Sequence, residues 1–204
     1  MIKYILVRHM ESEGNVRKAF NGVSESPLTE RGRVMKEKCV DTLTAMHDRT
    51  PFDLILTSPI ERARCIGEAV AERTGVECQI NDALKEFNFG IFEGLTAKEA
   101  EEKAPEIWQQ WMADYDGYTL PQGDSGDEYH RRMTLFLQEK EKEIEDKTVA
   151  VIAHGGTIHS ILMHYLGLPL RDKWHFNIPL GSIVTLRVFD GFGILDGLMV
   201  PEYD

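Results

Sequence analysis

Short apolar runs alternate with stretches of helical periodicity along this chain, and this alternation constrains its fold more than any other feature. Apolar runs of about four to eight residues bounded by turn signals are typical of buried strands. They predict strands at Ile2–Val7, Leu54–Thr57, Thr148–Ala153 and Ser182–Phe189. Asp190-Gly191 follows the last of these and precedes another apolar run, Ile194–Val200, so we expect a hairpin there.

The stretches between these runs carry the signals of helix ends. Thr29 is a favourable N-cap residue, and Gly75 and Gly167 are favourable C-cap residues. The predicted helices are Thr29–Asp48, Ile60–Thr74, Ser125–Asp146 and Thr157–Leu166. Strands that alternate with helices predict an α/β fold, a three-layer sandwich with a mostly parallel central sheet and helices on both faces.

The length of 204 residues predicts a single domain, residues 1–204, because no stretch rich in Gly, Ser and Pro divides the chain. The segment Leu95–Gly123 is expected to be an excursion from the core of that domain. Aromatic clusters of this kind usually pack against themselves rather than bind a ligand. The aromatic residues of the excursion that we expect to pack in this way are Trp108, Trp111, Tyr115 and Tyr118.

The net charge narrows the classes of partner. The chain has 23 basic and 34 acidic residues, a net charge of −11, which opposes binding to nucleic acid or to an anionic membrane. Most of the excess lies between Asp82 and Asp146, where 17 residues are acidic and 7 are basic. No apolar run approaches the roughly 20 residues of a membrane-spanning helix. We therefore expect no nucleic-acid partner and no membrane partner.

The cysteines and the first apolar run indicate a compartment. Cys39, Cys65 and Cys78 are odd in number and share no Cys-x-x-Cys spacing, which favours neither a disulfide framework nor a thiolate metal site. Met1–Val7 is too short an apolar run for a signal peptide, and Arg8 interrupts it. We expect a cytoplasmic protein, for which a monomer and a homodimer both stay open.

Three predicted strands are followed by basic or imidazole side chains. The first strand leads into Arg8-His9, the strand Leu54–Thr57 leads into a helix whose first turn carries Arg62, and Thr148–Ala153 leads into His154-Gly155-Gly156. Because the carboxyl ends of parallel strands meet at one edge of a sheet, we expect these side chains to converge there. A single histidine after a strand would usually be structural, whereas three coincidences indicate a site.

The chemistry of this set is that of an anion site. Two imidazoles with arginines and no acidic cluster favour an anion over a metal ion. Arginine binds phosphate through a planar fork, and a neutral imidazole nitrogen is a competent nucleophile. Positive neighbours would lower the pKa of such a histidine below its usual ~6.5 and keep that nitrogen unprotonated. The glycines after His154 would let backbone N–H groups approach a ligand at the start of a helix.

The order of several motifs resembles the histidine phosphatase superfamily, also called phosphoglycerate mutase-like, and its phosphatase branch in particular. The resemblance spans most of the chain, and its motifs occur in family order. They are Arg8-His9, Asn15, Gly22 with Pro27–Gly32, Ser58–Ala63, Leu84–Gly90 with Glu93–Thr96, and His154-Gly155-Gly156.

This resemblance implies a role for each matching residue. His9 would be the nucleophile that becomes a phosphohistidine, and Glu86 would protonate the leaving oxygen and later deprotonate water. Arg8, Arg62 and His154 would bind the phosphoryl oxygens. The resemblance further implies substrate-binding positions, with Gly155 contributing a backbone contact; they are Asn15, Gly22 and Gly155.

The resemblance implies a phosphatase that acts on a small phosphorylated metabolite with no metal and no cofactor. The alternative within the family is a phosphoglycerate mutase, which usually carries a longer, basic insertion after the acidic residue. Here the segment Gly90–Gly123 is short and acidic, which favours the phosphatase. A metal-dependent phosphatase and a catalytically silent phosphate-binding module are further alternatives. His159 and His164 follow His154 at intervals of five residues, so the three cannot share one helix face as metal ligands.

The substrate itself stays open. A sugar phosphate, a phosphoglycerate, an α-ribazole phosphate-like nucleotide precursor and a phosphoserine-type amino acid all present the same dianionic group. Met10 stands where the family usually has glycine, and its side chain could narrow the pocket or tilt the loop. Arg17 and Lys18 are candidates for the pocket mouth, with a solvated surface pair as the alternative.

Overall fold

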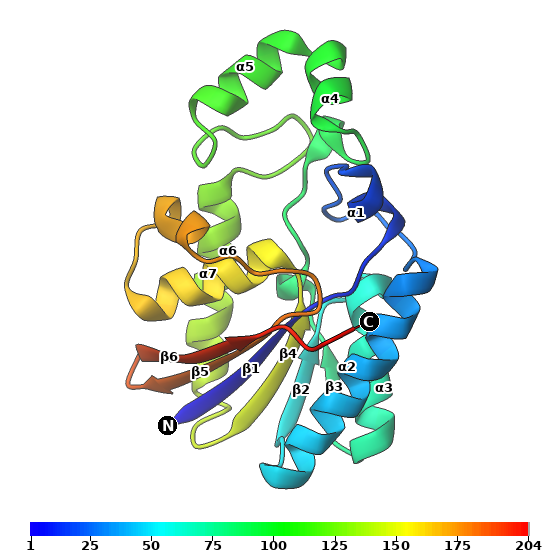
Figure 1. Ribbon diagram of the computed structural model, residues 1–204. Helices are drawn as coiled ribbons and strands as arrows, with labels where there is room; N and C mark the ends of the chain where they lie inside the picture. The colour runs from blue at the N-terminus through cyan, green and yellow to red at the C-terminus, as the bar shows by residue number, and fades with distance from the viewer. Residues whose placement is uncertain (204) are drawn as a thin grey trace.

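A six-stranded sheet forms the centre of the computed structural model, which describes residues 1–203 (Figure 1). The strand order across the sheet is β3-β2-β4-β1-β5-β6. The strands are β1 (Ile2–Arg8), β2 (Leu54–Thr57), β3 (Cys78–Ile80), β4 (Thr148–Ala153), β5 (Ile183–Phe189) and β6 (Phe192–Met199). The first four are mutually parallel, and β5 and β6 add an antiparallel hairpin at one edge. The predicted mostly parallel sheet is confirmed.

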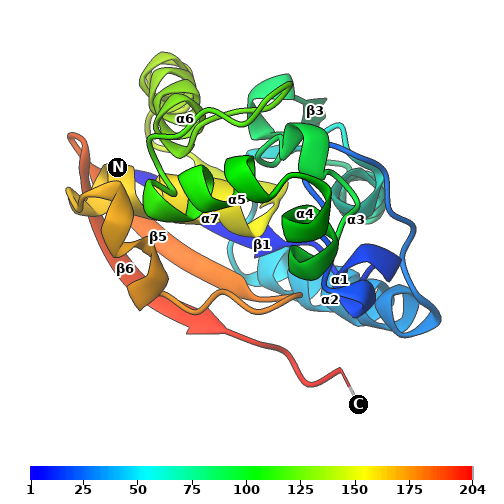
Figure 2. The same ribbon diagram turned by 90° about the horizontal axis from the view of Figure 1, so that it is seen from above.

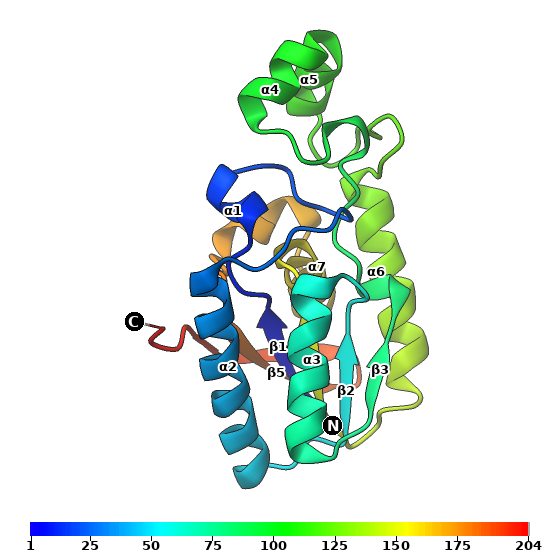
Figure 3. The same cartoon turned by 90° about the vertical axis from the view of Figure 1, so that its right-hand side faces the viewer.

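Helices cover both faces of this sheet, because its central strands are apolar on both sides. The longer helices are α2 (Glu30–Arg49), α3 (Glu61–Thr74), α6 (Gly126–Glu141) and α7 (Gly155–Leu166). Tyr4 and Leu6 of β1 belong to the core that α6 and α7 cover, whereas Ile5 and Val7 belong to the core that α2 and α3 cover. Figure 3 shows α2 and α6 on opposite sides of the strands. The predicted three-layer sandwich is therefore confirmed.

The predicted helix and strand ends agree with local backbone chemistry. The Thr29 hydroxyl accepts a hydrogen bond from the Gly32 N–H and begins α2, as an N-cap threonine does. Gly75 and Gly167 adopt the left-handed conformation and end α3 and α7. Asp190 and Gly191 both have positive φ, which matches the type I′ turn that joins β5 to β6.

Two helix ends differ from the prediction by two residues or more, and several short elements were not predicted. α6 ends at Glu141 rather than at Asp146, and α7 begins at Gly155 rather than at Thr157. His154 is thus the N-cap of α7, which directs the first N–H groups of that helix at the carboxyl edge of the sheet. The unpredicted elements are β3, the helices α1 (Glu13–Arg17), α4 (Ala97–Lys103) and α5 (Pro105–Ala113), and the 3₁₀ turns η1 (Asp82–Leu84), η2 (Gly90–Phe92) and η3 (Leu170–His175).

The excursion carries α4 and α5 and stands above the carboxyl edge of the sheet (Figures 1 and 2). Its small apolar core consists of Phe92, Ala100, Trp111 and Leu120. Trp111 is fully buried, and its ring stacks on Tyr115 at a centroid distance of 5.0 Å. The expected aromatic packing therefore occurs, and Tyr115 also lines a cavity outside this small core. Among residues 1–203, no helix has the length and apolar character needed to cross a membrane.

Trp111→Ala is expected to lower the free energy of unfolding by about 3–5 kcal/mol, because it leaves a cavity where a fully buried indole was. Trp111→Phe keeps an aromatic ring at the same position and should cost less. Urea unfolding followed by circular dichroism measures both. Equal losses for the two variants would contradict the assignment of Trp111 as the centre of this core.

Candidate active site

The fold brings Arg8, His9, Arg62 and His154 together at the carboxyl edge of the sheet. Arg8 is the last residue of β1, Arg62 lies in the first turn of α3, and His154 follows β4. The Arg62 Nε donates a hydrogen bond to His9 Nε2 at 3.3 Å, and the rings of His9 and His154 meet edge to face with centroids 5.1 Å apart. The exposed fractions of His9, Arg62 and His154 are 3%, 1% and 0%. The predicted convergence of these side chains is present.

The tautomer of His9 follows from its backbone contact. Its Nδ1 lies 2.8 Å from the carbonyl oxygen of Met10, which can only accept, so Nδ1 carries the proton. In the neutral ring the lone pair is then on Nε2, the atom that faces Arg62. Burial, Arg62 and Arg8 lower the pKa of His9 well below its ordinary value. His9 therefore presents an unprotonated Nε2 at neutral pH.

Two buried nitrogens point to a ligand that supplies acceptors. His154 Nε2 lies 2.8 Å from the Ser58 hydroxyl, whereas His154 Nδ1 and Arg8 Nε find no hydrogen-bond partner among the described residues. Burial, His9 and the two arginines lower the pKa of His154 well below its ordinary value. Buried polar atoms without partners are rare in proteins, and an anion with several oxygens would satisfy both of these.

Three backbone carbonyls hold the Arg62 guanidinium in place. They belong to Asn21 at 3.0 Å, Gly22 at 2.6 Å and Ser24 at 2.9 Å. Gly22 is required here, because a Cβ at this position would collide with the backbone oxygen of Phe87 and the carboxylate of Glu93. Gly22 thus contacts Arg62 and lies outside the cavity described below.

Glu93 organises this loop and was not assigned a role from the sequence. Its carboxylate accepts hydrogen bonds from the backbone N–H groups of Gly22, Val23 and Ser24 at 3.1–3.3 Å, and from that of Phe89 at 2.9 Å. The Ser24 hydroxyl donates to the same carboxylate. The carbonyls that face Arg62 therefore belong to a loop that Glu93 holds from the other side. The only signal in the sequence was the position of Glu93 within a family motif.

Glu86 lies in the loop between η1 and η2 and contacts the start of α7. One carboxylate oxygen accepts from the Gly156 N–H at 3.0 Å, and the other accepts from the Tyr129 hydroxyl at 2.9 Å. Tyr129 in turn lies 2.9 Å from the Thr157 hydroxyl. A Cβ at position 156 would collide with Glu86, so the second glycine of the motif makes room for this carboxylate. Tyr129 lies within the predicted helix Ser125–Asp146, and its hydroxyl contact was not foreseen.

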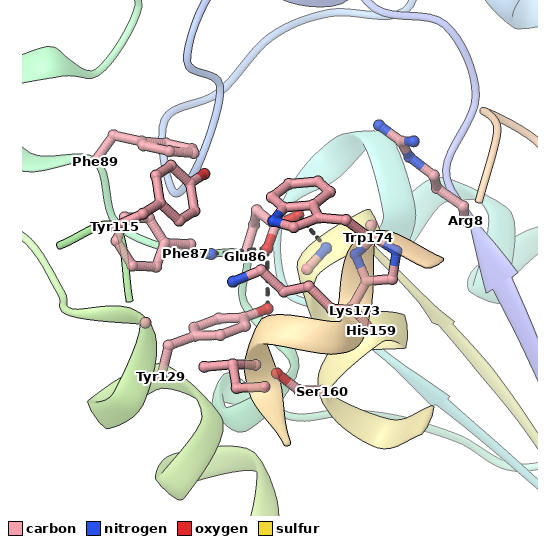
Figure 4. Close-up of a pocket in the computed structure, with 14 residues that line it drawn as sticks. Arg8, Glu86, Phe87, Phe89, Tyr115, Tyr129, His159, Ser160, Lys173 and Trp174 are labelled. Carbon is pink, nitrogen blue, oxygen red and sulfur yellow. Dashed lines mark hydrogen bonds between the residues drawn. The ribbon is translucent and has the colours of Figure 1, made fainter. Parts of the chain in front are cut away.

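A cavity of about 210 Å³ opens beside these groups (Figure 4). Of the predicted site residues, Arg8, Glu86 and Gly155 line it, together with Gly156. His9, Arg62 and His154 are not among the lining residues and are almost fully buried. The remaining lining residues are largely aromatic; they are Phe87, Phe89, Tyr115, Tyr129, Trp174, His159, Ser160, Leu170, Lys173 and Gly126.

The other residues singled out in the sequence lie outside this cavity. The side-chain Oδ1 of Asn15 accepts from the backbone N–H and the hydroxyl of Ser12, the N-cap of α1, in a capping box. Met10 is fully buried in the core beneath α2 and α3, so its side chain does not narrow the cavity. Arg17 pairs with Glu99 at 3.5 Å, and both Arg17 and Lys18 are exposed. The surface interpretation of this basic pair is therefore correct.

The donor types at this site suit an anion. Within residues 1–203, no cluster of three or more His, Cys, Asp or Glu side chains has the arrangement of a metal site. The guanidinium groups are cations with several N–H donors, and the N-terminal N–H groups of α7 are hydrogen-bond donors. The arrangement can hold a phosphoryl group against His9 Nε2 with Glu86 nearby.

Comparison with known proteins identifies the family. Residues 4–199 match the sequence profile of the histidine phosphatase superfamily, branch 1. The chain belongs to this superfamily. Membership was expected from the motifs and their order, and this match confirms it. The phosphatases among the similar proteins confirm the expectation of a phosphatase.

Similar members of the superfamily include enzymes of both predicted activities. An adenosylcobalamin/alpha-ribazole phosphatase from Salmonella typhimurium is 28% identical over 93% of this chain and 92% of its own length. A 2,3-bisphosphoglycerate-dependent phosphoglycerate mutase from Cytophaga hutchinsonii is 32% identical over 87% and 84%. The crystal structure of a putative alpha-ribazole-5'-P phosphatase from Escherichia coli superimposes with a TM-score of 0.87 at 24% identity, covering 97% of this chain and 95% of the other.

The buried histidines predict a pH-dependent stability. His154 stays neutral in the folded protein but takes up a proton in the unfolded chain below pH ~6.5, so stability falls as pH falls through that value. Between about pH 7.5 and about pH 5.5 this one histidine should cost about 1.4 kcal/mol of unfolding free energy. We expect His154→Asn to lose less stability than the wild type over this interval in urea unfolding. An identical loss in the two proteins would contradict a neutral, buried His154.

Proposed function

We propose that His9 is the nucleophile of this phosphatase and that the enzyme hydrolyses a small phosphomonoester through a phosphohistidine intermediate. The observation that carries this proposal is the state of His9, whose Nδ1–H donates to the Met10 carbonyl while the unprotonated Nε2 faces Arg62 and accepts its Nε–H. A neutral imidazole nitrogen held next to guanidinium groups combines a nucleophile with a phosphate-binding site.

In the first step His9 Nε2 attacks phosphorus, the N–P bond forms, and the bond from phosphorus to the leaving oxygen breaks. Glu86 donates its proton to that oxygen, and the alcohol departs. In the second step water attacks phosphorus, Glu86 takes a proton from it, and the N–P bond breaks to release inorganic phosphate. The support for this role is the position of Glu86, which lies at the start of α7 and lines the same cavity as Arg8.

Charge stabilisation comes from groups that the fold already holds in place. Arg8, Arg62 and His154 would bind the phosphoryl oxygens, with His154 Nδ1 and Arg8 Nε as the buried donors that gain partners. The Gly155 N–H and the positive end of α7 would add to this, and Asn15 would donate from its amide nitrogen. Since phosphoryl transfer needs little covalent work from the protein, such positioning would supply most of the rate acceleration.

Gly22 has a supporting part in this proposal. Its carbonyl accepts from Arg62, so it would act on the substrate through the position of that guanidinium. We also infer a reducing compartment, the cytoplasm, for the enzyme, because Cys39, Cys65 and Cys78 are free thiols.

The alternative function is a phosphoglycerate mutase, which one of the similar proteins is. The short acidic segment Gly90–Gly123 favours the phosphatase, because a mutase must also hold the negatively charged second substrate. Incubation with 3-phosphoglycerate, with and without 2,3-bisphosphoglycerate, separates the two activities. We expect release of inorganic phosphate from an accepted ester without formation of 2-phosphoglycerate, and isomerisation faster than phosphate release would favour the mutase.

The phosphohistidine is directly testable. When the wild-type enzyme is mixed with a ³²P-labelled substrate and quenched in alkali, label should stay on the protein, because phosphohistidine is an alkali-stable phosphoramidate. His9→Ala should retain no label and lose turnover by about 10³-fold or more, since the nucleophile is removed. Equal turnover by His9→Ala would end the proposal.

Glu86→Gln tests the acid–base role. The substitution keeps the shape of the side chain but removes the transferable proton, so kcat for an alkyl phosphate should fall by about 10²–10⁴-fold. An aryl phosphate with a good leaving group needs little protonation and should lose much less in its phosphorylation step. Burst kinetics resolve that step. Equal losses for the two esters would contradict protonation of the leaving oxygen by Glu86.

A further inference from the structure

We propose that the aromatic half of the cavity binds the leaving alcohol and selects a flat, uncharged aromatic group over one that carries a carboxylate. This inference rests on the proposed function, because it uses the direction in which the leaving group must depart. It adds a substrate class to the proposed reaction.

The direction follows from the order of residues along the cavity. Figure 4 shows Arg8 on one side of Glu86 and the rings of Phe87, Phe89 and Tyr115 on the other. The phosphoryl group would lie on the Arg8 side, and Glu86 would meet the leaving oxygen. The remainder of the alcohol must then extend from Glu86 toward the aromatic rings.

These rings form a wall with the geometry that aromatic groups favour. Phe87 and Phe89 meet edge to face with centroids 4.8 Å apart, and Tyr115 and Trp174 do so at 6.0 Å. Aromatic pairs favour such edge-to-face contacts at about 4.5–7 Å, so a further ring could join this wall in the same way. Trp174 lines the cavity and yet is 65% exposed, which leaves much of a large apolar surface for a ligand to cover.

The positive charge at the aromatic end of the cavity, that of Lys173, is already paired with a carboxylate. The lining residues of the cavity include one lysine, Lys173, and one arginine, Arg8. The Lys173 ammonium forms an ion pair with Asp116. That ammonium also lies 5.1 Å from the centre of the Tyr115 ring. A carboxylate on the leaving alcohol would have to compete with Asp116 for Lys173, or lose its hydration without a partner. Uncharged alcohols avoid this cost.

The volume limits the size of the group. A cavity of about 210 Å³ is smaller than the roughly 300–1,000 Å³ of pockets that hold drug-sized ligands. It therefore suits a phosphate joined to a small ring system rather than a long chain or an oligosaccharide. Selection would come from the apolar area that one ring buries against the aromatic wall.

The test compares kcat/KM for three esters, 2-phenylethyl phosphate, propyl phosphate and 3-phosphoglycerate. The first two have leaving alcohols of similar acidity and differ mainly in the ring. Burial of one phenyl group predicts a preference for the phenylethyl ester of about 10- to 100-fold over propyl phosphate. The preference over 3-phosphoglycerate should be larger. A ratio near one between the phenylethyl and propyl esters would overturn the inference.

Two variants locate the preference in this wall. Trp174→Ala removes an exposed ring and should lower the phenylethyl-to-propyl ratio by about 3- to 10-fold. Phe192→Ala, at a position on β6 that is 68% exposed, is the matched control and should keep the wild-type ratio. Equal effects of the two substitutions would count against Trp174 as part of the subsite.

Asp116→Asn provides a test by gain of activity. Without its carboxylate partner, the Lys173 ammonium can meet the carboxylate of 3-phosphoglycerate, so kcat/KM for that ester should rise about tenfold relative to propyl phosphate. An unchanged ratio would overturn the charge part of the inference. Circular dichroism spectra of the variant establish that it is folded.

Trapping of the phosphoenzyme distinguishes a failed subsite from a failed function. If propyl phosphate labels His9 and the aromatic ester has no advantage, the leaving-group inference is wrong and the proposed function stands. If no ester labels the protein, the phosphohistidine proposal fails and this inference fails with it. A labelled His9 together with the expected preference supports both.

Discussion

The burial of Arg62 is the interaction on which the site depends. A guanidinium that is almost fully excluded from water must be surrounded by acceptors, because an unpaired buried charge costs far more free energy than a protein can spare. The carbonyls of residues 21, 22 and 24 meet this need, and Glu93 holds the loop that carries them. With that loop in place, the Nε–H of Arg62 donates to His9 Nε2.

The same cation determines the state of the two histidines. Buried next to positive charge, His9 and His154 stay neutral, because a third or fourth charge in this space would be repelled and poorly solvated. The Met10 carbonyl then selects the tautomer of His9. An unprotonated Nε2 that faces a guanidinium is thus a consequence of ordinary electrostatics and one backbone contact.

Most of the acidic residues lie away from the arginines and histidines of the candidate site. The net charge of −11 comes mainly from the segment between Asp82 and Asp146, whose carboxylates are mostly exposed. Glu86, Glu93 and Asp116 are members of this segment that do contact the site. His9, Arg62 and His154 are buried at the carboxyl edge of the sheet. Within the excursion, Trp111 maintains the small core, while its stacking partner Tyr115 faces the cavity and Lys173. One aromatic cluster therefore supports the fold and forms a wall of the candidate substrate site.

The sequence by itself determined five of the six strands, the four longer helices and the convergence of Arg8, His9, Arg62 and His154. These follow from local signals, since apolar runs, caps and turns depend on neighbouring residues and parallel strands must end at one edge. The proposed role of Glu86 came from the family resemblance, because no periodicity places that carboxylate beside Gly156, 70 residues away. Only the tertiary structure decided that Glu93 holds the Arg62 loop, that Met10 points into the core, and that Asp116 neutralises Lys173 in the cavity. Each of these depends on contacts between segments distant in the chain, and such contacts are set by how the layers pack and not by any local pattern.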